Sequence, residues 1–182
     1  MPPDTREFIY CLDPNDTITH VNSDWIEFAR ENAQGFVPGR VIGQSLWNFI
    51  TSSKVKHLYS IIFEKARQGL LIQGLPYRCD APDRRRFLEM DLSPADDTII
   101  QIKSRIVREE LREYVSLLSD FRDMSGEFLT ICSFCKKIRV AGGRWEEIEE
   151  AIKLLGLAEA RPLPQLSHGV CEKCFDEWSS CN

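Results

Sequence analysis

The chain has 182 residues, of which 43% are hydrophobic and 28% charged, which is enough for one ordinary domain and a small additional module. Its formal net charge of −5 disfavours a nucleic-acid surface. No run of about 20 apolar residues and no apolar opening segment is seen, so we expect a protein without membrane spans in a reducing compartment, the cytoplasm.

The first 50 residues predict a hairpin followed by short helices. Residues 8–12 and 17–21 are strand-like and are separated by Asx and Pro residues that favour a turn. Residues 24–30 follow two good helix-capping residues and place their aromatic side chains on one side of a helix. After Gly and Pro residues at 35–39, residues 41–50 form a compact apolar segment that predicts two short helical turns.

The next stretch predicts one long helix and three strands. Residues 54–68 repeat apolar side chains at helical spacing, and Gly69 ends the pattern. Residues 70–79, 86–92 and 98–107 read as strands, and the last two alternate apolar and polar side chains. This alternation is typical of half-buried antiparallel strands.

This order of elements, together with residues 13–22 (DPNDTITHVN) and 41–50 (VIGQSLWNFI), resembles a PAS sensory domain over about residues 6–108. The resemblance implies an α+β fold with a five-stranded antiparallel sheet and helices on one face. It also implies a cavity for a small ligand or cofactor, which it does not identify, and a role in sensing rather than catalysis. We therefore assign residues 1–108 to a PAS-like sensory domain.

Residues 109–127 predict a connecting helix, because Leu111, Leu118 and Phe121 lie near heptad spacing. Two heptads are too few to establish a coiled coil. The functional interpretation is a signal helix that forms a homodimer through residues 109–124. The alternative is an amphipathic helix that packs back on its own sheet.

Four cysteines form two pairs, Cys132-Ser-Phe-Cys135 and Cys171-Glu-Lys-Cys174, with residues 136–170 between them. Two residues between cysteines allow a tight turn, or knuckle, that points both thiolates at one metal ion, and two such knuckles complete a tetrahedral site. Four protein ligands leave no position for water or substrate. The spacing therefore predicts a structural zinc site.

Other interpretations of the cysteines stay open. The same thiolates could bind iron as in rubredoxin, or they could be four unrelated buried thiols, and disulfides fit less well because seven cysteines cannot all pair. His168, three residues before Cys171, could replace one cysteine as a ligand. It could also orient the knuckle through its ring N–H, or be a solvated loop residue.

The tail, from residues 131–139 through Trp145 to Ser167-His-Gly-Val-Cys-Glu-Lys-Cys174, resembles a cysteine module found beside PAS and receiver domains in bacterial signalling proteins. We assign residues 128–182 to this zinc-binding module. Trp145, Ile148, Ile152 and Leu155 predict one side of a helix with an acidic opposite face. About 50 residues bury too little apolar area to fold reliably, so we expect the metal-free tail to be loose.

Several functions find little support in the sequence. His57 is predicted to face solvent on the long helix and His20 to be an ordinary strand residue, so haem is not expected. Arg84, Arg85 and Arg86 predict a solvated turn, with a partner or phosphate contact as the alternative. Common nucleotide, metalloprotease and hydrolase motifs are missing, so we expect no enzyme activity.

The first interpretation is therefore a sensory module that signals by contact with a protein partner and carries a structural zinc tail. A thiol-based redox switch at the zinc-thiolate site is the second interpretation. A DNA-binding regulator is the third, and the net charge disfavours it.

Overall fold

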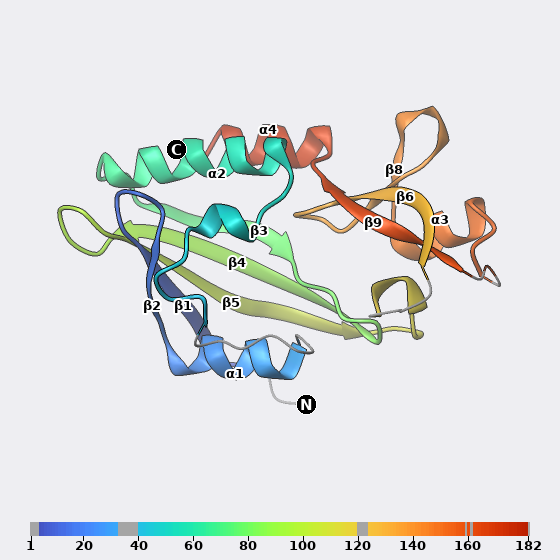
Figure 1. Cartoon of the computed structure of the whole chain (residues 1–182), viewed down its shortest axis with the longest axis horizontal. Helices are drawn as coiled ribbons and strands as arrows, with labels where there is room; N and C mark the ends of the chain where they lie inside the picture. Colours follow the sequence, from blue (N-terminus) through green and yellow to red (C-terminus); the bar gives the residue numbers. More distant parts are fainter. Residues whose placement is uncertain (1–3, 33–39, 120–123, 159, 161, 182) are drawn as a thin grey trace.

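The computed structural model describes residues 4–32, 40–119, 124–158, 160 and 162–181, and the statements below concern these residues. The fold is α+β, with one five-stranded sheet and a second, four-stranded sheet nearer the C-terminus (Figure 1). None of the described helices is long and apolar enough to span a membrane.

The larger sheet is antiparallel throughout and has the strand order β2-β1-β5-β4-β3. Its strands are β1 (Glu7–Leu12), β2 (Ile18–Val21), β3 (Ile72–Arg78), β4 (Arg84–Pro94) and β5 (Ile100–Leu111). These are the five strands that the sequence predicted, although β4 and β5 run several residues further than expected. The five-stranded antiparallel sheet implied by the resemblance is confirmed.

One face of this sheet is apolar and carries the helices. Ile102 pairs with Tyr10 on one side and Leu92 on the other, so all three share this face. Helix α1 (Ser23–Asn32) packs here, with the ring centroid of Phe28 4.5 Å from that of Phe8. The helices therefore lie on one face, as predicted.

Helix α2 (Ser53–Arg67) covers the same face and follows a short 3-10 helix, η2 (Leu46–Asn48). It begins where the Ser52 side chain accepts a hydrogen bond from the Val55 amide, and its buried stripe matches the predicted helical spacing. Residues 41–50, predicted as two helical turns, form only η2. The buried residues of α2 are Val55, Leu58, Ile62, Phe63 and Ala66.

The other face of the sheet carries a ladder of charged pairs. Arg105 contacts Glu89 at 2.6 Å and Asp91 at 2.7 Å, and Lys103 contacts Glu7 at 3.2 Å. All five residues lie on strands whose alternate side chains form the core. The sheet therefore has one apolar face and one charged face, the expected pattern for an antiparallel sheet with one covered face.

The tail contains strands that the sequence did not predict. They form a sheet of order β8-β7-β6-β9, in which β6 and β9 are parallel. The strands are β6 (Met124–Cys132), β7 (Ile138–Arg139), β8 (Trp145–Glu146) and β9 (Leu163–Gly169), and the other elements are η4 (Ala141–Gly143), α3 (Ile148–Leu154) and α4 (Glu172–Ser179). The predicted tail helix is thus shorter than expected, because Trp145 pairs with Arg139 in β8 instead of starting the helix.

The predicted connecting helix over residues 109–127 is wrong where the structure describes it. Strand β5 continues to Leu111, η3 (Ser116–Leu118) is one short turn, and β6 begins at Met124, while residues 120–123 lie outside the described residues. Strand pairing overrides the helical pattern, because Glu109 and Glu110 lie directly opposite arginines of β4. A homodimer through residues 109–124 stays a prediction, without the helix on which it rested.

The tail packs onto the N-terminal half of the chain, which contains the five-stranded sheet. Helix α4 lies beside α2 (Figure 1), and its Trp178 is fully buried and donates from Nε1 to the Pro76 carbonyl at 3.1 Å. Lys65 of α2 donates to the Ser179 carbonyl at the end of α4 at 3.4 Å. The main core therefore includes residues of both parts. The division at residues 1–108, 109–127 and 128–182 stays a prediction.

Candidate metal centre

The first cysteine knuckle begins at the end of β6. Cys132 closes the turn by donating its amide to the Lys137 carbonyl at 2.8 Å and accepting from the Lys136 amide at 3.1 Å. Lys136 has a φ of 60°, a left-handed conformation that is unfavourable for a side chain of this kind. The chain uses it to reverse direction and enter β7.

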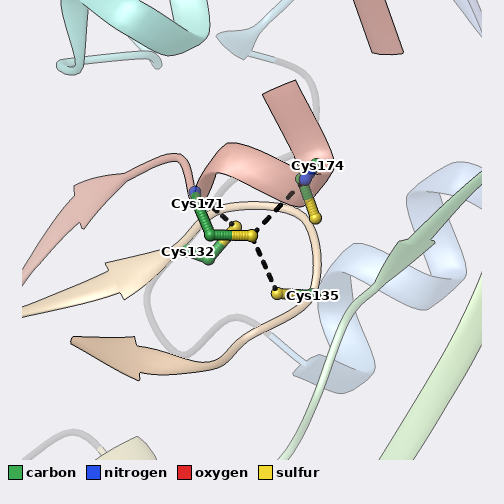
Figure 2. Close-up of side chains that lie close together, drawn as sticks. All are labelled: Cys132, Cys135, Cys171 and Cys174. Atoms are coloured by element: carbon green, nitrogen blue, oxygen red, sulfur yellow. Dashed lines mark hydrogen bonds between the residues drawn. The ribbon is translucent and has the colours of Figure 1, made fainter. Parts of the chain in front are cut away.

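The second knuckle joins β9 to α4. Cys171 is the N-cap of α4, and its sulfur accepts a hydrogen bond from the Cys174 amide at 3.5 Å (Figure 2). The N-terminal end of a helix carries partial positive charge, which favours thiolates placed beside it.

The parallel pairing of β6 with β9 brings the two knuckles together. Cys132 lies opposite Gly169 in this register, and the Ser133 amide donates to the Gly169 carbonyl at 2.9 Å. The Cys171 amide donates to the Cys132 sulfur at 3.5 Å. Two cysteine pairs that are far apart in sequence are thus held side by side by backbone contacts.

The four cysteines converge on one point (Figure 2). The sulfur atoms of Cys132, Cys135, Cys171 and Cys174 all lie within 4.8 Å of one another, and those of Cys135 and Cys171 are 3.7 Å apart. A tetrahedral ion with metal–sulfur bonds of about 2.3 Å requires sulfur–sulfur separations of about 3.8 Å. These four residues could therefore hold a metal ion.

The sulfurs perturb one another strongly. Hydrogen bonds from the Cys135 and Cys174 thiols lower the pKa of Cys132. The contact with Cys132 raises the pKa of Cys135 to about 12, and contacts with Cys132 and Cys135 raise that of Cys174. One thiolate is thus stabilised by neighbours that keep their protons. A divalent cation would take the place of those protons and favour ionisation of the other thiols.

The basic residues near the cysteines have separate roles. Lys136 donates from Nζ to the Ser133 carbonyl at 2.8 Å, so its charge lies against the first knuckle. Lys137 is 4.0 Å from Glu147, while Arg139 and Lys173 are exposed. Of these cations, Lys136 is the one held against the first knuckle by a hydrogen bond.

The histidines do not join the sulfur cluster in the described part of the chain. His168 lies on β9 opposite Ile131 at the surface, and partial burial of its ring together with the nearby Lys136 charge lowers its pKa. His57 on α2 is exposed, as predicted, and His20 lies on strand β2, as predicted, where its side chain is also exposed. The group of four metal-ligating residues consists of cysteines alone.

Hollows lie beside both knuckles. A cavity of about 290 Å³ is lined by Tyr10, Tyr59 and Tyr77 of the N-terminal half and by Ser133 and Phe134 of the first knuckle, among others. A larger groove of about 740 Å³ is lined by three of the four cysteines, which are Cys135, Cys171 and Cys174. The first knuckle therefore borders the smaller cavity, and the cysteine cluster borders the larger groove.

The basic run after Asp83 forms ion pairs with acidic residues. Arg84 contacts Asp83 at 2.9 Å and Glu109 at 3.2 Å, and Arg86 contacts Glu109 at 3.1 Å. Arg85 contacts Glu149 of α3 at 2.7 Å. These contacts link the start of β4 to β5 and to the tail, which differs from the solvated turn predicted from sequence.

Sequence reasoning missed two residues that connect the cysteines to the rest of the molecule. Phe134, between the first two cysteines, is 2% exposed, and its ring centroid lies 3.9 Å from that of Trp178. Trp178 follows Cys174 by four residues and so shares its side of α4. A large aromatic residue inside a Cys-x2-Cys turn is the signal that could have indicated burial of this knuckle.

Comparison with known proteins gives no family model that matches and no curated protein that matches. Solved structures similar to this chain include a domain of the HTR-like protein from Haloarcula marismortui, with 19% identity, 56% of this chain and 98% of that chain covered, and a TM-score of 0.42. The photoactive yellow protein domain of the sensor histidine kinase Ppr from Rhodospirillum centenum has 13% identity, 57% and 88% coverage, and a TM-score of 0.39.

A third similar structure is the PAS domain of the RpfR quorum-sensing receptor from Cronobacter turicensis in complex with BDSF. It has 14% identity, 59% and 100% coverage, and a TM-score of 0.38. The similar structures thus include PAS domains. The fold class rests on the strand order and the single covered face of the sheet.

Proposed function

We propose that this chain is a non-catalytic sensory and signal-transduction protein in which a PAS-like domain is joined to a structural zinc site. The observation that carries the proposal is the convergence of four cysteine sulfurs within 4.8 Å. Support for sensing comes from the predicted PAS resemblance and from the cavity of about 290 Å³ between the N-terminal half and the tail.

Zinc is the metal that best suits this set of donors. Thiolates select soft or borderline metals, and four-cysteine sites built from two Cys-x2-Cys pairs typically hold tetrahedral zinc. Such a site has no open position, so the ion stabilises structure rather than activating water. Thiolate ligands also suit the reducing compartment expected from the sequence.

Signalling would then occur by contact with a protein partner. The sequence shows no common nucleotide-binding or hydrolase motif, which favours a module without catalysis. The arginines of the run 84–86 are paired with carboxylates, and the net charge is −5, so nucleic acid is a poor candidate partner.

Metal analysis of purified protein tests the proposal. We expect one zinc per chain in the wild type, loss of at least half of it in Cys171→Ser, and full retention in Cys11→Ser. Cys171 is one of the four converging residues, whereas Cys11 lies on β1 of the other sheet. Chelation should lower the melting temperature of the wild type, because structural zinc contributes folding free energy.

Two results would count against the proposal. One is wild-type protein that binds no zinc after refolding with excess metal. The other is equal metal content in Cys171→Ser and wild type. If the protein contains more iron than zinc, the four-cysteine site stands, but its metal is iron.

A thiol redox switch is a second candidate, because Cys135 is only half-buried and lines the open groove beside the knuckles. The thiolate of an accessible cysteine is the form that oxidants attack. Release of zinc by stoichiometric hydrogen peroxide, reversed by a thiol reductant, would favour this candidate over a purely structural site.

A further inference from the structure

The first cysteine knuckle inserts an aromatic side chain into the core of the N-terminal half. Phe134 lies between two of the proposed ligands, and its ring is buried against Trp178 and within 6.1 Å of the Tyr59 ring of α2. Tyr59 in turn packs edge-on against Trp178, with ring centroids 5.8 Å apart. Three aromatic rings from α2, the first knuckle and α4 thus form one cluster.

The backbone of the same knuckle holds the edge of the main sheet. The Phe134 carbonyl accepts a hydrogen bond from the Arg78 amide at 2.7 Å, and Arg78 ends β3, an edge strand. Helix α4, which begins in the second knuckle, also holds β3, because Trp178 donates from Nε1 to the Pro76 carbonyl at 3.1 Å. The first knuckle and α4 therefore contact the same strand of the larger sheet.

The knuckle also forms a wall of the cavity of about 290 Å³. The tail contributes Ser133, Phe134 and His168 to its lining, and the N-terminal half contributes Tyr10 and Tyr77, among others. The residues that line this cavity include no Asp, Glu, Lys or Arg. Burial raises the pKa of both tyrosines, which keeps their phenols uncharged. The cavity is therefore aromatic and lined by uncharged phenols, and movement of Phe134 would change its shape.

The turn that places Phe134 there contains two of the four converging cysteines, Cys132 and Cys135. It ends in a left-handed backbone at Lys136, which is unfavourable for a lysine and persists only if the surroundings hold it. Backbone hydrogen bonds hold the turn in part, such as that from the Lys136 amide to the Cys132 carbonyl at 3.1 Å. A metal ion bound to both sulfurs would add a second, stronger restraint on the same turn.

We propose that metal occupancy of the cysteine centre sets the shape of the tyrosine-lined cavity, with Phe134 as the mechanical link. This inference rests on the proposed metal site. The metal and a small uncharged molecule in the cavity then affect each other's binding, because a coupling between two sites is reciprocal. The tail thus forms part of the wall of the proposed sensory cavity and is not only an attached module.

Hydrogen exchange of the full chain, with zinc and after chelation, tests the link. We expect exchange in α2 (Ser53–Arg67) and β3 (Ile72–Arg78) to be at least tenfold slower in the zinc form. Helix α1 (Ser23–Asn32), which packs at the opposite end of the sheet, is the internal reference and should change by less than threefold (Figure 1). A change of equal size in all three elements would indicate global stabilisation and overturn the inference.

A pair of variants separates the link from the metal site. In Phe134→Leu with one zinc bound, we expect the protection of α2 and β3 by zinc to fall to threefold or less. Phe128→Leu is the matched control, because Phe128 lies four residues before Cys132 but is 64% exposed, and it should keep the full effect. If Phe134→Leu does not fold, Trp178→Phe, which loses the hydrogen bond to Pro76, replaces it.

The two proposals fail in different ways. If zinc binds to four cysteines but leaves exchange in α2 and β3 unchanged, the link is overturned and the metal site stands. Undiminished protection in the folded, zinc-bound Phe134→Leu variant, or in Trp178→Phe where it replaces that variant, also overturns the link. If no zinc binds at all, the metal site itself has failed.

Discussion

Gly169 shows at the scale of a single residue how closely the two parts of the centre are packed. It ends β9 opposite Cys132, and a Cβ atom added to it would lie 2.7 Å from the Thr130 Cγ2 atom of β6. Real Cβ atoms do not approach so closely, so any larger residue would push the two strands apart. Those strands carry both knuckles.

We expect Gly169→Ala to destabilise the zinc-bound protein by about 1–3 kcal/mol, because overpacking of this kind forces backbone movement. Thr130→Ser removes the methyl group that would clash and keeps the hydroxyl that lies 3.3 Å from Ser167. The double variant should therefore recover most of the loss. Urea unfolding measures all three variants, and a double variant no more stable than Gly169→Ala would contradict the explanation.

The site residues differ in how far the sequence predicted them. Cys132, Cys135, Cys171 and Cys174 were predicted as one group because Cys-x2-Cys spacing has a local geometric meaning. The burial of Phe134 was not predicted, because it depends on the docking of the tail against α2. Contacts between segments far apart in sequence have no periodic pattern.

At the scale of elements, the segment after β5 shows why local pattern failed. Residues 108–118 have good helix formers and apolar side chains near heptad spacing, yet Leu111 is 78% exposed at the end of a strand. Arg85 and Arg86 lie opposite Glu110 and Glu109, so the strand gains complementary cross-strand pairs. The strands of the first sheet were predicted because their alternation is local.

A buried charge network joins the β3–β4 turn to the tail. The side chain of Asp80 is 1% exposed and pairs with Arg78 and Arg112, whose side chains are 8% and 5% exposed. Arg78 also contacts Glu147 at 2.8 Å, and Arg112 contacts Glu149 at 3.5 Å. Asp80 is thus the shared carboxylate of two buried cations.

We expect Asp80→Asn to destabilise the folded protein by about 3–5 kcal/mol, because loss of one partner leaves buried charges without compensation. Asp97→Asn, in an exposed loop of the same sheet, is the matched control and should change stability by less than about 0.5 kcal/mol. Urea unfolding of the zinc-bound proteins measures both. A loss in Asp80→Asn below about 1 kcal/mol would show that the network contributes little to stability.

At the scale of the whole molecule, the tail and the N-terminal half share one core. Trp178 of α4 is fully buried beside α2, and Val170 and three of the cysteines belong to the same cluster as the main sheet. The sequence predicted a small module that is loose without its metal. It could not predict this docking, because the apolar positions of α4 do not indicate which surface they cover.

The most direct test of the metal centre is X-ray absorption at the zinc edge of the purified full chain. We expect four sulfur neighbours at about 2.3 Å and no nitrogen or oxygen neighbour. A first shell with fewer than four sulfurs, or with a water or imidazole ligand, would contradict a closed site made of Cys132, Cys135, Cys171 and Cys174.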